Sequence, residues 1–182
     1  MIFYRHRPRS AAPDRSPGFT LLELVAALAV VAISLTLAVP SFREIMARST
    51  TTAIANDLVG AFAQARAEAA KRGVRVAVLA ASGDADWSSG WGVYADSGRD
   101  GGFATKVVAR GAVPEGYAVR TGGASANRVV FDVQGELVGA TSVDVNVCRP
   151  GRDAAKSRFI QVRASGIVVA RRDTSTSTAP SC

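Results

Sequence analysis

An uncharged apolar run near the N-terminus, Leu24–Phe42, limits most strongly what this chain can fold into. It has 19 residues, ten of them Leu, Ile, Val or Phe. As a helix it would be about 28 Å long, close to the hydrocarbon thickness of a bilayer. The ten large apolar residues together favour insertion by roughly 3–6 kcal/mol. The run lacks the polar stripe of a soluble core helix, so the sequence predicts a transmembrane helix.

The segment before this run is basic and sets its orientation. Residues 1–18 contain Asp14 and four arginines: Arg5, Arg7, Arg9 and Arg15. The positive-inside rule therefore places the N-terminus in the cytoplasm. A secretory signal peptide also has a basic start, but its apolar segment is usually about 7–15 residues long. A cleaved signal ahead of a soluble secreted β-domain stays as an alternative, and it predicts a mature N-terminus beyond Pro40.

The pattern after Pro40 becomes that of an amphipathic helix. Ile54, Leu58 and Phe62 recur at i, i+4 and i+8, with alanines between them and charged residues on other faces. Gly73 is a suitable C-cap. We therefore expect one helix over residues 19–72, with a kink near Pro40 because proline removes a backbone donor.

From Val74 onward the apolar period changes towards two, which is typical of strands separated by turn residues. The candidate strands are 74–80, 91–95, 106–109, 117–120, 128–132, 137–138, 143–147, 159–164 and 167–171. The absence of alternating strands and helices favours antiparallel pairing. The expected fold class is α+β: a long N-terminal helix packed on an antiparallel β-sandwich.

The most specific motif is Gly18-Phe-Thr-Leu-Leu-Glu23 between the basic segment and the apolar run. It resembles the type IV prepilins, which include pilins and the pseudopilins of type II secretion. The resemblance implies that a prepilin peptidase cuts after Gly18 and methylates the new N-terminus, Phe19. It also implies that Glu23, the fifth mature residue, serves assembly, and that Pro40 occupies a position where pilins often carry proline.

The physical chemistry of Glu23 agrees with this resemblance. A carboxylate at the membrane edge is costly, so it should have a partner. In the family this glutamate pairs with the N-terminal amine of a neighbouring subunit. The simpler alternative is a side chain that reaches back to the lipid headgroups.

A second motif runs from Trp87 to Asp96 and reads Trp-Ser-Ser-Gly-Trp-Gly-Val-Tyr-Ala-Asp. It resembles the signature of the GspH/FimT subgroup, and the resemblance continues through Phe131 and Gly135. Aromatic residues at such spacing usually fill a sandwich interior. We therefore expect a structural core, without an active site, from Trp87, Gly90, Trp91, Tyr94, Phe131 and Gly135.

The C-terminal part is strongly basic, with seven basic residues and one acid over residues 149–172. Such a segment attracts DNA, anionic lipid or an acidic partner, or is a solvated strand face. FimT-like minor pilins can carry Gly-Arg-x-Arg here and bind DNA. In this sequence Gly166 is followed by Ile-Val-Val, so the motif is missing. The remaining candidates for polyanion contact are Arg163, Arg171 and Arg172.

The remaining chemistry is sparse. Cys148 and Cys182 form one expected disulfide, worth roughly 3–4 kcal/mol by chain entropy. His6 is the single histidine and lies in the leader, so a histidine-based catalytic site is excluded from the rest of the chain. Four loop aspartates lack the EF-hand spacing and are expected in turns: Asp84, Asp86, Asp96 and Asp100. We expect no enzyme, no metal and no cofactor.

These observations predict five segments: a leader (1–18), a transmembrane helix (19–42), an amphipathic helix (43–73), a periplasmic β-domain (74–172) and a tail tied by the disulfide (173–182). The resemblance implies a minor pseudopilin of type II secretion in the inner membrane. Its partners would be other pilin-like subunits, the prepilin peptidase, the inner-membrane assembly platform and membrane lipid. The alternative is a FimT-like minor type IV pilin that binds DNA for uptake.

Overall fold

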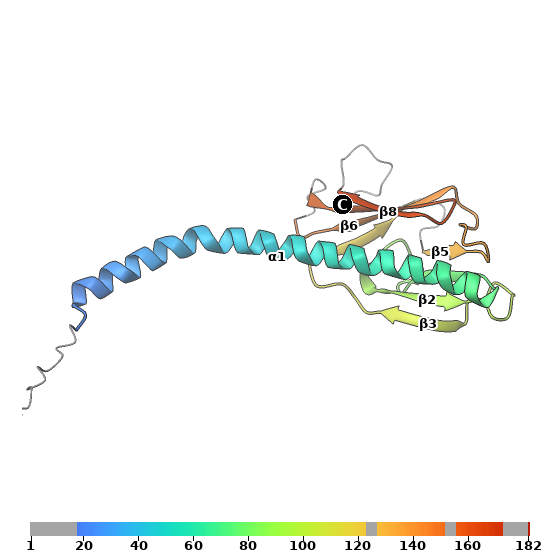
Figure 1. Cartoon of the computed structure of the whole chain (residues 1–182), viewed down its shortest axis with the longest axis horizontal. Helices are drawn as coiled ribbons and strands as arrows, with labels where there is room; N and C mark the ends of the chain where they lie inside the picture. The colour runs from blue at the N-terminus through green and yellow to red at the C-terminus, as the bar shows by residue number, and fades with distance from the viewer. Residues whose placement is uncertain (1–17, 123–126, 152–155, 173–181) are drawn as a thin grey trace, which may run out of the picture. The chain divides into compact units, whose positions relative to one another are not determined.

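The computed structural model describes residues 18–122, 127–151, 156–172 and 182. The predicted leader, apart from Gly18, and the predicted tail, apart from Cys182, lie outside the described residues. The chain divides into two compact units, residues 1–42 and 43–182, which are described separately below. Figure 1 shows the chain coloured from the N-terminus to the C-terminus.

One helix, α1 (Leu21–Arg72), runs through both units and contains Pro40. It begins at Thr20, whose hydroxyl oxygen accepts a hydrogen bond from the backbone N–H of Glu23 at 3.2 Å, as an N-cap does. It ends at Gly73, which has a φ of 63° and donates its N–H to the carbonyl of Ala69. The single long helix is confirmed, while the kink at Pro40 stays a prediction.

In the first unit the apolar side chains of α1 are exposed. The exposed fraction of its large hydrophobic residues runs from 43% at Val39 to 82% at Leu21. By length and composition, α1 is the one helix in the described part of the chain that is able to cross a membrane, and its apolar window has no buried residue. A surface of this kind needs lipid or neighbouring helices to cover it.

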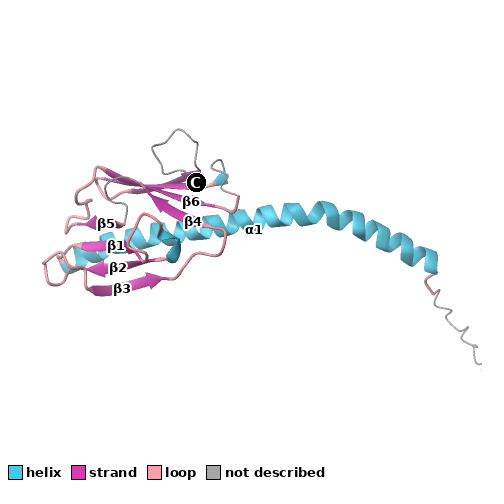
Figure 2. Ribbon diagram, turned by 180° about the vertical axis from the view of Figure 1, so that it is seen from behind, coloured by secondary structure: helices cyan, strands magenta, loops and turns pink. Residues whose placement is uncertain are grey.

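The described residues of the second unit form eight strands in two antiparallel sheets (Figure 2). The first sheet has the order β3-β2-β1-β5 and the second has the order β4-β6-β7-β8. The strands are β1 (Val76–Ala80), β2 (Trp91–Ala95), β3 (Thr105–Arg110), β4 (Ala118–Thr121), β5 (Arg128–Phe131), β6 (Ser142–Cys148), β7 (Arg158–Arg163) and β8 (Val168–Arg172). A short 3-10 helix, η1 (Trp87–Ser89), precedes β2. The α+β class with antiparallel sheets is confirmed.

Both sheets share one hydrophobic core with the second half of α1. The predicted apolar face is buried, and Leu58 and Phe62 are fully inaccessible to solvent. The Phe62 ring lies 6.2 Å from that of Trp87 and 6.5 Å from that of Phe131, measured between centroids. Because alanines such as Ala65 and Ala69 occupy the same face, the helix backbone can approach the sheets closely.

One predicted strand is wrong. Leu137–Val138 forms no strand, because Leu137 makes only an isolated bridge to Phe131 and donates its N–H to the carbonyl of Ala164. Trp87, which lies between two predicted strands, is in η1, because the Asp86 carboxylate accepts from the Ser88 N–H and caps that turn. The other predicted strands are present, with ends displaced by one or two residues.

Gly90 connects η1 to β2 at a place where no side chain fits. Its φ is 107°, and a Cβ there would lie 2.3 Å from the carbonyl oxygen of Arg110 in β3. We expect Gly90→Ala to lower the free energy of unfolding by about 1–3 kcal/mol, the usual cost of such backbone strain. Denaturant unfolding followed by tryptophan fluorescence measures this. Gly111→Ala is the control, since that position has an ordinary φ and open space; equal losses in both variants would contradict the prediction.

Candidate functional site

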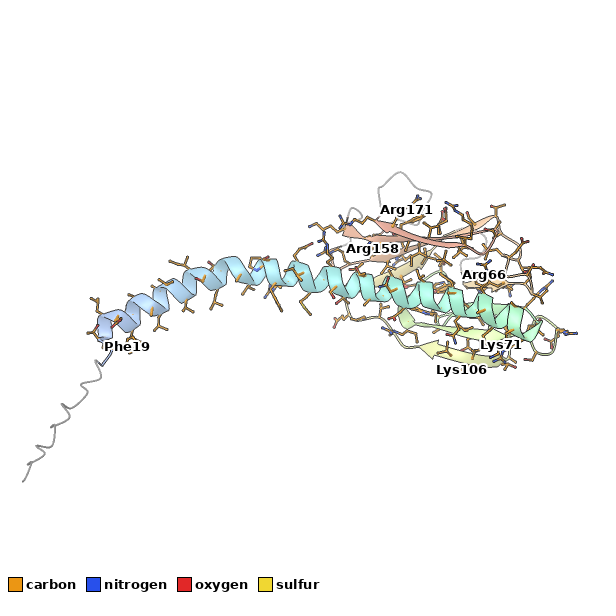
Figure 3. The ribbon with its side chains drawn as sticks, in the orientation of Figure 1. Phe19, Arg66, Lys71, Lys106, Arg158 and Arg171 are labelled. Carbon is orange, nitrogen blue, oxygen red and sulfur yellow. A yellow bond between two sulfur atoms is a disulfide. The ribbon has the colours of Figure 1, made fainter. Side chains whose placement is uncertain are left out.

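The N-terminal motif lies at the exposed start of α1. Phe19 is 86% exposed and lies two residues before the first residue of α1 (Figure 3). A Cβ added to Gly18 would meet no atom within 4 Å. The structure therefore sets no packing requirement for glycine at this position and leaves the bond between Gly18 and Phe19 accessible.

Glu23 lies in the first turn of α1 and is exposed. The backbone N–H groups of a first turn carry partial positive charge, which favours a carboxylate there. Thr20 caps the same turn through the Glu23 N–H. The arrangement presents the Glu23 carboxylate to solvent or to another molecule, and gives it no catalytic neighbour among the described residues.

The aromatic signature forms part of the core. Trp87 and Phe131 are fully buried and Trp91 is 3% exposed. The half-buried Tyr94 covers Gly92, because a Cβ at Gly92 would lie 2.5 Å from a carbon of the Tyr94 ring. Trp87, Trp91 and Phe131 belong to the core that α1 shares with the sheets, whereas Tyr94 is not part of that core.

Gly135 has a comparable structural reason to be glycine. Its φ is 79°, and a Cβ there would lie 2.8 Å from Nε of Arg66. Gly166 also has a positive φ, of 73°, and a Cβ there would overlap the carbonyl oxygen of Gly135. Two turns thus meet beside Arg66 of α1, which Figure 3 labels.

The loop aspartates organise turns. The Asp96 carboxylate accepts hydrogen bonds from the backbone N–H groups of Asp100 and Gly101, each at 3.1 Å. A hydrogen bond from the Ser88 side chain lowers the pKa of Asp86, and one from Ser82 lowers the pKa of Asp84. These contacts account for the aspartates by turn chemistry.

The three arginines proposed for polyanion contact do not form one patch. Arg171 and Arg172 end β8 and pair with Phe159 and Arg158, whereas Arg163 lies at the opposite end of β7. The Arg171 guanidinium lies 4.7 Å from the centre of the Phe159 ring, in a cation–π contact. Arg163 is therefore separated from the other two by the length of the β7–β8 ladder.

Instead, the structure assembles a basic pocket from four segments. It has a volume of about 60 Å³ and is lined by side chains of α1, of the chain after β6, of the start of β7 and of the end of β8. The residues of this basic pocket are Glu44, Arg48, Thr51, Arg149, Lys156, Ser157, Arg158 and Arg172.

Glu44 and Arg149 form the central ion pair of the basic pocket. Two guanidinium nitrogens of Arg149 donate to the two carboxylate oxygens of Glu44, at 2.8 and 2.7 Å. Such bidentate pairs are the strongest of the ordinary ion pairs. The Arg149 side chain is 9% exposed and that of Glu44 is 49% exposed. Arg158 donates to the Thr52 hydroxyl at 3.2 Å, which adds a second link between α1 and the sheet.

The disulfide lies beside the basic pocket. Cys148 and Cys182 are joined by a disulfide, as the sequence leads us to expect. The Ser157 hydroxyl lies 3.3 Å from the sulfur of Cys182.

Sequence reasoning missed the basic pocket because Glu44 and Arg149 are 105 residues apart. The available signal was the cluster of charges that follows Phe42 directly.

The Glu44–Arg149 pair predicts a dependence of stability on pH. The hydrogen bond from Arg149 holds the pKa of Glu44 below its ordinary value of 4.5. A lowered pKa stabilises the fold above the ordinary value, and this contribution is lost as the pH falls through the folded-state pKa. We expect Glu44→Gln to be less stable than the unchanged protein at pH 7, and the difference to shrink below pH 4.5.

The measurement is thermal unfolding in detergent micelles, followed by tryptophan fluorescence at several pH values. Other carboxylates also have lowered pKa values, among them Glu68 and Asp86, so the difference between the two proteins is the informative quantity. Glu115→Gln, at an exposed position, is the control. A difference that does not change with pH would contradict the prediction.

Comparisons with known proteins agree with the sequence motifs and the fold. The family model described as type II transport protein GspH matches residues 55–166, more than half of the chain. The model of the prokaryotic N-terminal methylation motif matches residues 14–39. No curated protein matches the sequence.

Solved structures of two pilin-like proteins resemble the fold. One is the type IV minor pilin FimU of Pseudomonas aeruginosa strain PAO1, with a TM-score of 0.61 and 18% identity over 72% of this chain and 96% of that one. The other is the minor pseudopilin EpsH of the Vibrio cholerae type 2 secretion system, with a TM-score of 0.51 and 11% identity over 68% of this chain and 98% of that one. Together with the family match, they lead to one conclusion: the chain is a member of the GspH family of pilin-like proteins, a group of minor pilins and pseudopilins that are structural subunits.

Proposed function

We propose that this protein is a minor pseudopilin, a structural subunit of the short filament that drives type II secretion across the outer membrane. The observation that carries the proposal is an exposed apolar helix preceded by a processing motif and followed by a domain of the GspH family. A filament of packed N-terminal helices provides the apolar surroundings that the first half of α1 needs.

The proposal assigns a role to each part of the N-terminal motif. The prepilin peptidase cuts between Gly18 and Phe19 and methylates the Phe19 amine. Residues 19–42 span the inner membrane as a single pass, with the N-terminus in the cytoplasm and residues 74–172 in the periplasm. Residues 43–73 continue the helix onto the domain, Pro40 kinks it, and residues 173–182 are a tail held by the disulfide.

Glu23 is the assembly residue in this proposal. Its carboxylate pairs with the N-terminal amine of a neighbouring subunit when helices leave the bilayer and enter the filament. Such a pair removes the cost of an unpartnered carboxylate in apolar surroundings. The assembly platform of the inner membrane and other pilin-like subunits are the implied partners.

The second candidate is a FimT-like minor type IV pilin that binds DNA for uptake. The concentration of basic side chains around β7 and β8 favours it, since cations attract phosphates without reading sequence. The separation of Arg163 from Arg171 and Arg172 weighs against it, because a duplex is held by a row of phosphate contacts. The secretion pseudopilus is therefore the function we propose.

Deleting the gene and restoring it tests the choice between the two machines. We expect the deletion to abolish appearance of secreted enzymes in the medium and to leave pili and DNA uptake intact. Restoration with Glu23→Gln should yield a cleaved, membrane-inserted protein that does not recover secretion. A deletion that removes DNA uptake while secretion continues would replace the first candidate with the second.

N-terminal sequencing of the protein from membranes tests the processing step separately. The proposal requires an N-methylated Phe19 as the first residue. A mature N-terminus beyond Pro40 would instead identify a secreted soluble domain behind a cleaved signal peptide.

A further inference from the structure

The basic pocket carries an excess of positive charge. Five cationic side chains line it against one carboxylate, that of Glu44. The lining residues therefore carry four positive charges in excess, and such a concave cluster attracts anions.

The cations of the pocket are held in place by the fold. Arg149 is fixed by its bidentate pair with Glu44, and Lys156 lies 4.0 Å from the same carboxylate. Arg158 and Arg172 are paired residues on adjacent strands, and Arg48 projects from α1 one turn after Glu44. Within the described residues, neither Arg48 nor Arg172 joins an ion pair, which leaves two guanidinium groups available to an incoming anion.

The size of the pocket restricts that anion. Its volume of about 60 Å³ admits a few water molecules, and hence a group as small as a phosphate. Arginine suits phosphate well, because its planar fork donates two parallel hydrogen bonds. If the ligand is a larger molecule, only one of its phosphate groups fits inside the pocket.

The position of the pocket along the chain selects the source of the phosphate. Arg48 follows Phe42 by six residues, a helical rise of about 9 Å. The headgroup layer extends roughly 5–8 Å beyond the hydrocarbon on each side of a bilayer, so the Arg48 backbone lies just beyond that layer and its long side chain can reach back into it. Ile45 and Met46 lie between Phe42 and Arg48 in the sequence, and their side chains are 61% and 51% exposed. Exposed apolar and cationic side chains in a single helical turn are typical of a segment at a membrane interface.

We propose that the basic pocket binds the phosphate of an anionic phospholipid headgroup. This inference rests on the proposed function, because it takes residues 19–42 to span the inner membrane. Bound headgroups hold the base of the domain at the membrane surface until the subunit is extracted into the filament. Duplex DNA fits less well, since one small pocket accepts one phosphate and Arg163 lies at the far end of β7.

The test is a titration of the full-length protein in neutral detergent micelles, followed by NMR of the arginine side-chain Nε–H groups. The probes are short-chain phosphatidylglycerol, short-chain phosphatidylcholine, inorganic phosphate and a duplex DNA of twenty base pairs. We expect phosphatidylglycerol to shift the resonances of Arg48, Arg158 and Arg172 with saturation, and to bind at least tenfold more tightly than the other three probes.

Variants connect the signal to the pocket. Arg48→Gln with Arg172→Gln removes two exposed guanidinium groups and keeps the Glu44–Arg149 pair. We expect this double variant to bind phosphatidylglycerol about 30-fold more weakly, as loss of two cations near an anionic surface predicts. The matched control removes two exposed cations of the first sheet, Lys106→Gln with Arg128→Gln, and should bind unchanged.

Several outcomes would overturn the inference. They are equal binding of inorganic phosphate or phosphatidylcholine, tighter binding of DNA, or equal weakening in the two double variants. None of these depends on secretion, and the deletion experiment does not depend on lipid binding. Failure of this inference is therefore distinguishable from failure of the proposed function.

Discussion

A Gly18→Val variant is expected to retain its 18-residue leader and to lose all activity in secretion. The peptidase must admit the backbone on both sides of the cut bond, and a branched side chain immediately before that bond obstructs it. The structure separates an effect on cleavage from an effect on folding. A Cβ at Gly18 meets nothing within 4 Å, and the position has an ordinary φ, so the substitution should not disturb the fold.

The measurement is the mass of the protein recovered from membranes, together with the amount of secreted enzyme in the medium. Thr20→Ser is the matched control, because it retains the hydroxyl that caps α1 at the Glu23 N–H and leaves Gly18 in place. Its leader should be removed and secretion should continue. A cleaved Gly18→Val protein that supports secretion would show that this residue does not define the processing site.

The sequence predicts the elements of this fold well where the signal is local. The buried face of α1 follows from the spacing of Ile54, Leu58 and Phe62, because residues four apart lie on one side of a helix. The strands follow from alternation and from the glycines between them. Leu137 was misassigned because its partners are Phe131 of β5 in the first sheet and Ala164, which follows β7 of the second sheet, and no local pattern encodes such contacts.

The candidate sites also differ in whether their residues are close together in the sequence. The proposed processing motif is contiguous in sequence, so roles for Gly18, Phe19 and Glu23 can be proposed without a structure. The basic pocket joins Glu44 to Arg149 and Arg158 to Arg172, and these pairings depend on sheet order and register. The sequence also groups Arg163 with Arg171 and Arg172, whereas the antiparallel β7–β8 pair places Arg163 at the other end.

The signature aromatics contribute to stability in a way that the core arrangement makes testable. Phe62 is fully buried at the contact between α1 and both aromatic residues Trp87 and Phe131. Its removal leaves a cavity in the core that the surrounding side chains cannot fully fill. We expect Phe62→Ala to lower the free energy of unfolding by about 3–5 kcal/mol, a large share of the roughly 5–15 kcal/mol that is typical of a domain.

Denaturant unfolding of the full-length protein in micelles measures this loss, with the fluorescence of Trp87 and Trp91 as the signal. The midpoint should fall while the slope stays unchanged, since the surface exposed on unfolding is nearly the same. Phe62→Leu, which keeps most of the volume, should lose much less and remains measurable if the alanine variant does not fold. Ile45→Ala removes a large apolar side chain from an exposed position on the same helix and should leave the midpoint almost unchanged. If Phe62→Ala and Ile45→Ala shift the midpoint equally, then α1 is not anchored to the sheets through Phe62, because only a buried side chain loses both its transfer energy and its contacts when it is truncated.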